Sequence, residues 1–181
     1  MATQKIGIHP LHGRLGGQRT ILLRKHSHLT IRLPADLIRR VLPLAGQTLE
    51  INGLRLLVGA PRVRALTAAQ DLYSRLVVIK GMLEPDTFLK AARSRMDTMG
   101  VVGEVRLARR QTSRAMDPLG TGGRGEWVRR TLQVKERHIV GYALEVRGLS
   151  SEDSIRLQSN GLGGRRRFGC GIFVPARIAE K

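Results

Sequence analysis

The sequence predicts a mixed α+β fold made of two ferredoxin-like (RRM-like) modules in tandem, of which the first is incomplete. From residue 72 onward, segments follow in the order strand, helix, strand, strand, helix, strand, which is the ferredoxin-like order. The residues before that point show strands, a helix and further strands, as in the last part of a similar module. With 181 residues, of which 41 % are hydrophobic, the chain can form one medium domain or two small ones. We therefore divide it into a partial N-terminal module over 1–68 and a C-terminal module over 69–181.

Short strands and one helix are predicted in the first module. Apolar residues alternate as in strands at 21–23 and 28–33. Pro34 then stands where the first turn of a helix begins, and we expect that helix over 35–42. Three apolar residues spaced for one face of this helix are expected in the core: Leu37, Ile38 and Val41.

A hairpin is predicted at the end of the first module. The pair Asn52-Gly53 separates two apolar segments at 49–51 and 54–58. Both residues tolerate the positive φ angles that a two-residue hairpin turn requires. This pair is the strongest turn signal in the chain.

The second module is expected to begin with a strand over 72–80 and a helix from Pro85 to Met99, with acidic residues in its first turn. Three apolar residues of this helix are expected in the core: Phe88, Met96 and Met99. A strand candidate at 101–107 is interpreted as an added edge of the sheet. The glycine-rich segment at 109–125 predicts a long mobile loop.

A second hairpin and helix complete the predicted module. Residues 127–135 and 139–146 alternate as two strands, and Ser150 is placed to cap a helix that carries Leu157. A last strand is expected at 170–174. Trp127 either stacks on a ligand or anchors the hairpin in the core, and the core position is the preferred interpretation.

The charge of the chain predicts an anionic partner. Lys and Arg number 32 against 14 Asp and Glu, a net charge of +18, and Arg predominates. The planar Arg side chain matches phosphate geometry, so the favoured partner is nucleic acid, with an anionic membrane surface as the weaker alternative. Aromatic residues make up only 3 %, which argues against an RNA platform of stacked rings. No apolar run approaches the roughly 20 residues of a membrane span, so we expect a soluble, cytoplasmic protein.

The most specific segment is the glycine- and arginine-rich loop at 161–171. Glycines let a backbone approach a phosphate closely, and consecutive arginines supply positive charge, so the loop is expected to hold a nucleic-acid backbone. The alternative is a flexible linker with solvated charges, but an embedded Leu162 and Phe168 are unusual in a linker. The expected contact residues of the loop are Gly161, Gly163, Gly164, Arg165, Arg166 and Arg167.

Other basic residues are candidates for phosphate contacts with a nucleic acid. They occur in basic pairs or on predicted strands and helices, and some of them must face solvent without touching the nucleic acid. The candidates are Arg39, Arg129, Arg130 and Lys135.

Metal chemistry is not predicted. Four histidines lie in the N-terminal stretch, at positions 9, 12, 26 and 28, and no carboxylate or cysteine precedes Asp36 to complete a ligand set. The single Cys170 also excludes a cysteine-based zinc finger and an intramolecular disulfide. No metal and no cofactor are therefore expected.

The chain resembles a known family. Residues 161–174 look like the C-terminal glycine-rich signature of the CRISPR-associated endoribonucleases that process precursor CRISPR RNA, within the repeat-associated mysterious protein superfamily. The Myxococcus-type branch of these enzymes is similar in further segments: 6–10, 33–34, 42–46, 78–81, 84–85, 139–144 and 149–150. The resemblance covers nearly the whole chain.

The resemblance implies tandem ferredoxin-like domains and a metal-independent cut of the CRISPR repeat. The ribose 2′-OH attacks the neighbouring phosphate and leaves a 2′,3′-cyclic phosphate and a 5′-OH. It also implies that the enzyme stays on the repeat hairpin as a subunit of a Cascade-type complex. The alternative within this fold is a subunit that binds the crRNA hairpin without cutting it. A ribosomal or chaperone-like RNA-binding protein would explain the charge but not the signature.

The resemblance also indicates the catalytic residues. His9 matches the family's histidine just past its first helix, and we expect it to act as general base, because an ordinary histidine pKa of about 6.5 suits proton transfer at neutral pH. His12 is the second candidate. The family has a strand and a helix before this point, and only eight residues precede His9, so the first module is expected to be incomplete.

Overall fold

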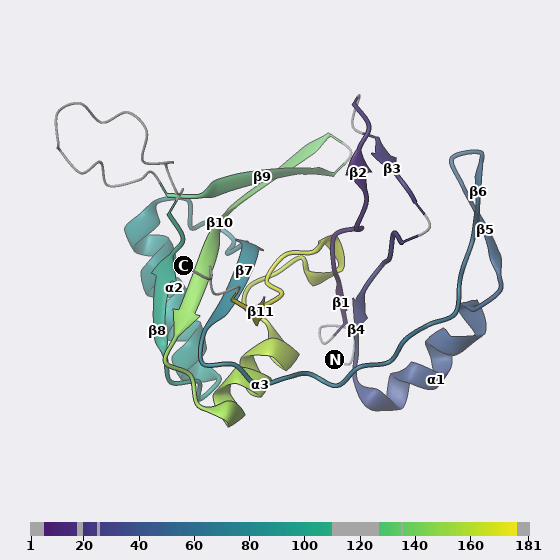
Figure 1. Ribbon diagram of the computed structural model, residues 1–181. Coiled ribbons are helices and arrows are strands. Elements are labelled where there is room, and N and C mark those ends of the chain that lie inside the picture. The colour runs from purple at the N-terminus through teal and green to yellow at the C-terminus, as the bar shows by residue number, and fades with distance from the viewer. Residues whose placement is uncertain (1–5, 18–19, 25, 110–126, 135, 177–181) are drawn as a thin grey trace, which may run out of the picture.

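The computed structural model describes residues 6–17, 20–24, 26–109, 127–134 and 136–176. It shows a mixed α+β protein with antiparallel sheets, which confirms the predicted fold class at this level (Figure 1). Among these residues, no helix has both the length and the apolar character needed to cross a membrane.

The second half forms one five-stranded antiparallel sheet and two helices. Along the chain these elements are β7 (Leu72–Val77), α2 (Pro85–Thr98), β8 (Glu104–Leu107), β9 (Arg129–Val134), β10 (Arg137–Arg147), α3 (Ser151–Asn160) and β11 (Val174–Pro175). Neighbouring strands follow the order β11-β7-β10-β8, and β9 also pairs with β10. The first strand of this half, β7, thus lies between β10 and the last strand, β11.

The segment predicted as an added edge, 101–107, has a different place. Its strand β8 pairs with β10 through Leu107 and Leu144, and β9 pairs with the same edge of β10 through Arg129 and Tyr142. β8 and β9 are therefore two parts of one edge strand, and the prediction of a separate edge was wrong. The predicted loop at 109–125 falls almost entirely outside the described residues.

Both helices start as their sequences predict. Pro85 occupies the first position of α2, where its missing N–H costs no hydrogen bond. The Ser150 hydroxyl accepts a hydrogen bond from the Asp153 N–H at 3.1 Å and caps α3. Gly161 is the C-cap of α3, and the next residue, Leu162, is buried.

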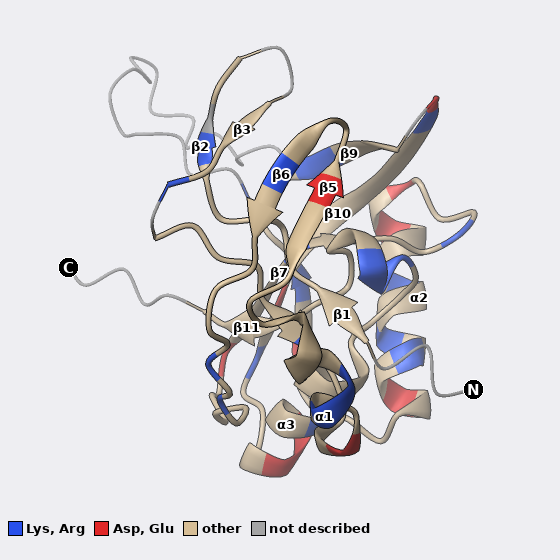
Figure 2. Cartoon of the chain, turned by 90° about the vertical axis from the view of Figure 1, so that its right-hand side faces the viewer, with Lys and Arg blue, Asp and Glu red and all other residues tan. Residues whose placement is uncertain are grey.

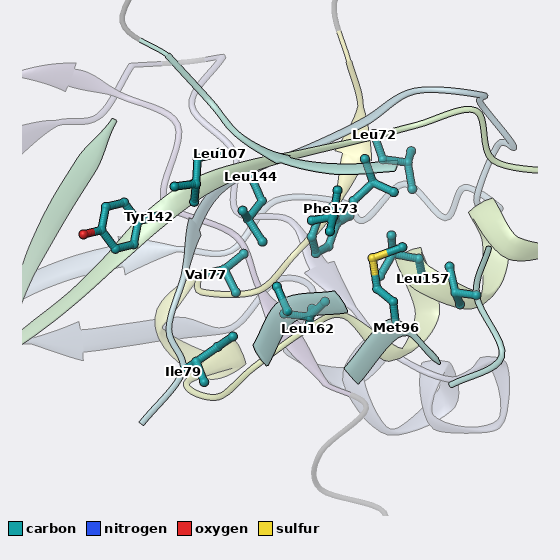
Figure 3. Packing of buried hydrophobic residues seen from close by; sticks show 14 of the residues in the cluster. Leu72, Val77, Ile79, Met96, Leu107, Tyr142, Leu144, Leu157, Leu162 and Phe173 are labelled. Atoms are coloured by element: carbon teal, nitrogen blue, oxygen red, sulfur yellow. The ribbon is translucent and has the colours of Figure 1, made fainter. Parts of the chain in front are cut away.

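The hydrophobic core lies between the sheet and the two helices (Figure 3). Phe88 and Met96 are buried, which confirms their predicted places, and Met99 packs against the cluster while partly exposed. The Phe88 ring meets Tyr142 edge-on with centroids 5.0 Å apart. Tyr142 also donates a hydrogen bond from its hydroxyl to the Leu83 carbonyl oxygen at 2.6 Å, so its polar end is satisfied inside the core.

The first half consists of two-stranded sheets and a short helical stretch. The strands are β1 (Gly7–Ile8) with β4 (Ile31–Arg32), β2 (Arg14–Leu15) with β3 (Ile21–Leu22), and β5 (Thr48–Ile51) with β6 (Leu54–Leu57). The helical stretch comprises η2 (Ala35–Leu37), α1 (Ile38–Val41) and η3 (Leu42–Leu44). Asn52 and Gly53 have φ angles of 50° and 75°, which confirms the predicted hairpin turn.

The predicted core positions of the first helix are wrong. Leu37, Ile38 and Val41 are each partly exposed, and no residue of this helical stretch is buried. Among the described residues of 6–68, only Gly7 is buried. An apolar helix face forms a core only against a second apolar layer, and no described element covers this one.

Candidate functional site

The glycine-rich loop connects α3 to β11 and lies beside β1 (Figure 1). Its glycines have two different roles. Gly163 has a φ of 80°, and a Cβ there would lie 2.4 Å from the Val78 carbonyl oxygen, so only glycine fits against this backbone. Gly161 likewise approaches the Gly171 carbonyl oxygen. A Cβ at Gly164, in contrast, meets nothing within 4 Å, so this glycine faces open space.

The three consecutive arginines of the loop do not act alike. Arg165 and Arg167 are exposed, but only 7 % of Arg166 is exposed. Arg166 donates hydrogen bonds from Nη1 to the carbonyl oxygens of Ser159, at 2.8 Å, and of Asn160. It therefore caps the C-terminus of α3, where the last carbonyls have no partner within the helix. Its backbone belongs to the short 3-10 turn η4 (Arg166–Phe168).

His9 lies next to this buried arginine. β1 packs against η4, and a Cβ at Gly7, on β1, would lie 3.5 Å from Arg166 Nη2. The His9 imidazole is half-buried, its Nε2 is enclosed, and no described residue forms a hydrogen bond with that atom. Burial, together with the charges of Arg32 and Arg166, lowers the pKa of His9 to about 4, and burial is the largest of these causes. His9 is therefore neutral at pH 7.

Arg32 is a member of this site that the sequence reasoning missed. It lies on β4 opposite Gly7, and its Nη1 donates to the carbonyl oxygens of Phe173 at 2.7 Å and Gln158 at 3.0 Å. Burial and the neighbouring Arg166 lower its pKa to about 10. The only local signal was a charged residue inside an apolar strand candidate. Arg32 thus joins the first half of the chain to the second and brings a second cation close to His9.

The second predicted catalytic histidine lies elsewhere. His12 stacks on His28, with ring centroids 4.7 Å apart and 18° between the ring planes, and the two residues face each other across an antiparallel bridge. Both are exposed. His26 occupies a turn. Among the described residues, no three His, Cys, Asp or Glu side chains are placed to hold a metal ion.

The other predicted contact residues do not gather at the site. Arg39 is exposed on α1, whereas Arg129 and Arg130 are exposed on β9, and Figures 1 and 2 show these two elements far apart. Because neighbouring strand residues point to opposite faces, Arg129 and Arg130 face different sides of the sheet. Lys135 lies outside the described residues.

Trp127 is not the core anchor that we expected. It is 37 % exposed, and the Arg109 guanidinium carbon lies 4.5 Å from its ring centroid, a cation–π contact at the end of β8. Basic residues occur over both halves of the molecule, and acidic residues are visible on β5, α2 and α3 (Figure 2).

A pocket of about 370 Å³ opens beside the loop. Its wall contains residues from β1's N-terminal end, the end of α3 and the loop itself: Ile6, Asn160, Gly163, Gly164, Arg165, Arg166, Arg167 and Phe168. Since Arg166 also faces His9, the pocket and the candidate base share one wall.

Comparison with known proteins identifies the family of the chain. A model of the family described as Cas6 Crispr matches residues 1–178. The CRISPR-associated endonuclease Cas6 of Myxococcus xanthus (strain DK1622) is 33 % identical over 176 residues, which are 97 % of this chain and 68 % of that protein. A solved structure, described as the characterization of a Cas6-related gene from Pyrococcus furiosus, matches all of this chain and 81 % of that one, with a TM-score of 0.60 and 15 % identity. The structural match shows a shared fold, and the sequence matches show that this chain belongs to the Cas6 family of CRISPR-associated endonucleases.

Proposed function

We propose that this chain is a metal-independent endoribonuclease that binds the repeat hairpin of precursor CRISPR RNA and cuts it by attack of a ribose 2′-OH. The observation that carries the proposal is the placement of a neutral His9 beside the partly buried Arg32 and the buried Arg166, at the edge of the glycine-rich loop. Such a site combines a proton acceptor with positive charge for a phosphate, the two requirements of this reaction.

The fold supports the same function. The β-α-β-β-α-β order of the second half, with its strand neighbours β11-β7-β10-β8, supports a ferredoxin-like module over 69–181. The open apolar faces in 1–68 fit a partial module of the same kind. The candidate site lies where the two modules meet, because β1 and β4 contact the loop and the end of α3.

The proposed chemistry assigns a role to each group. The neutral imidazole of His9 takes the proton of the 2′-OH, the 2′ oxygen bonds to phosphorus, and the bond to the 5′ oxygen breaks. Arg32 and Arg166 stabilise the negative charge that grows on the phosphoryl oxygens. The scissile phosphate itself raises the pKa of His9, because its negative charge offsets the two guanidinium groups. The leaving 5′ oxygen takes a proton from water, because His12 lies elsewhere, stacked on His28.

Contacts away from the cut would hold the RNA stem. Arg39, Arg129 and Arg130 present exposed charge on two elements there, whereas Arg165 and Arg167 are exposed on the loop itself, near the cut. Lys135 belongs to the same proposed set. Such contacts to phosphates support retention of the hairpin after cleavage, as in a Cascade-type complex, and they weaken as salt rises.

One observation favours a second function, binding of the crRNA hairpin without cleavage. The enclosed Nε2 and the low pKa of His9 make it a weak base until an anion binds. A protein that binds the crRNA hairpin without cutting it would show the same structure.

The test is cleavage of a labelled CRISPR repeat RNA in EDTA by the unmodified chain, by His9→Ala and by His138→Ala. His138 is an exposed histidine on β10 and serves as the matched control. We expect a 2′,3′-cyclic phosphate product from the unmodified chain and His138→Ala, and tight binding without product from His9→Ala. A 2′-deoxy substitution at the cut should also block cleavage. Binding without any cut by the unmodified chain would favour the hairpin-binding role instead.

A further inference from the structure

The pocket beside the glycine-rich loop contains an exposed aromatic ring. Phe168 is 46 % exposed, although the chain has only three phenylalanines and the other two, Phe88 and Phe173, are fully buried. Exposure of a large apolar ring has a cost in water, and a ring in the wall of a pocket is typical of a site that stacks a flat ligand.

The polar groups around this ring suit a nucleotide. Asn160, the last residue of α3, is exposed in the same wall, and its amide offers both a donor and an acceptor to a base edge. Arg165 precedes η4, Arg167 lies within it, and both are exposed, so their guanidinium groups are available to a phosphate. The pocket therefore combines a stacking surface, a base-reading amide and two phosphate-binding cations.

The size and position of the pocket limit what it holds. Its volume of about 370 Å³ suits a single nucleotide rather than a base pair, since small-molecule sites span roughly 300–1,000 Å³. Gly164 faces open space on this side, so the backbone leaves room for the ligand. Arg166 lines the pocket, and η4, to which it belongs, contacts β1 beside His9, so the ligand lies near the proposed cut.

We propose that this pocket takes one unpaired nucleotide of the repeat RNA, next to the cut, with its base stacked on Phe168 and its phosphate bound by Arg165 and Arg167. The proposal rests on the proposed function, because it names the part of the RNA that the loop selects. Stacking on Phe168 would make the enzyme sensitive to a single unpaired position at the base of the hairpin.

Binding measurements on repeat RNAs with single abasic sites test the proposal. A set of labelled hairpins carries an abasic residue at each unpaired position beside the stem in turn. We expect one of these positions to weaken binding to the unmodified chain about tenfold, the usual contribution of one stacked base. Phe168→Ala should weaken binding of the intact RNA by about the same factor and leave the affinity for that one abasic RNA unchanged.

Two further variants control for folding and for general loss of affinity. Phe168→Trp keeps a ring and should restore binding. Gly164→Leu fills the pocket without backbone strain, because Gly164 has no positive φ and a Cβ there contacts nothing, and it should reproduce the loss. Val102→Ala removes an apolar side chain that is 77 % exposed elsewhere and should bind every RNA as the unmodified chain does.

The outcomes separate this inference from the proposed function. If the unmodified chain binds no repeat RNA, the proposed function fails. If it binds and cuts, but Phe168→Ala weakens all hairpins equally or none, only the nucleotide pocket is refuted. Binding of free AMP, CMP, GMP and UMP completes the test. If one of them binds to the unmodified chain but not to Phe168→Ala, and no abasic site changes the affinity for the hairpin, the pocket binds a free nucleotide and the RNA assignment is wrong.

Discussion

Replacing Arg166 tests the distinction between the buried arginine and its exposed neighbours. Arg166→Met keeps an unbranched apolar stem and removes the charge-assisted hydrogen bonds to the carbonyl oxygens of Ser159 and Asn160. We expect this variant to lose stability as well as RNA affinity. Arg167→Met, at an exposed position in the same turn, should lose affinity alone.

The size of the effect follows from the contacts. A hydrogen bond from a charged donor contributes about 1.5–3 kcal/mol. Both bonds come from one nitrogen, and Asn160 is exposed, so water can replace part of what is lost. We therefore expect a loss of about 2 kcal/mol, which for a chain of this size lowers Tm by roughly 4–8 °C.

Thermal melting followed by circular dichroism, together with urea unfolding, measures this difference. The two variants and the unmodified chain are compared at pH 7 and at equal protein concentration, and the urea m-value checks that the extent of unfolding is the same. A Tm of Arg166→Met equal to that of the unmodified chain would refute the capping role. A comparable drop in Arg167→Met would show that the loop responds as a whole.

Three further predictions concern other parts of the structure. Arg32→Met removes two hydrogen bonds between the halves of the chain, so limited proteolysis should cut the segment before residue 69 faster than in the unmodified chain. The pKa of His9 is about 4 in the folded chain and 6.5 in the unfolded chain, so between pH 6.5 and pH 4 the unfolded chain binds a proton that the folded chain does not. The free energy of unfolding should therefore fall by about 2 kcal/mol, after allowance for partial exposure, as the pH drops through this range. His9→Gln should lack this slope in urea unfolding. Tyr142→Phe removes the hydrogen bond to Leu83 and should cost about 1 kcal/mol in urea unfolding with no change in RNA affinity, since it lies in the core.

Much of the second half follows from local sequence rules. The Ser150 cap, the proline at the start of α2 and the apolar face through Phe88 and Met96 all appear in the structure as predicted. Each of these features depends on residues within one or two helical turns. The edge strand that β8 and β9 form together does not follow from local rules. Its two parts are separated by many residues in the sequence, and they come together only by pairing with the same edge of β10.

In the first half, the local sequence pattern did not predict which residues are buried. Its apolar periodicity predicted a core helix, yet Leu37, Ile38 and Val41 are partly exposed. A pattern shows that one face of a helix is apolar, but a second layer has to cover that face before it becomes a core. The Asn52-Gly53 hairpin was predictable nonetheless, because a turn needs only its own backbone angles.

Some features of the candidate site follow from the sequence, and others depend on the tertiary structure. By itself, the sequence determined the charge, the glycine-rich loop and a set of candidate histidines, since these are properties of composition and short segments. Only the tertiary structure decided that Arg166 is buried while Arg165 and Arg167 are exposed. It also brought Arg32 to carbonyls 126 and 141 residues away and placed both cations beside His9. The physical reason is that burial and the pKa of a group depend on neighbours that are distant in sequence, and those neighbours are defined only when the two halves of the chain pack together.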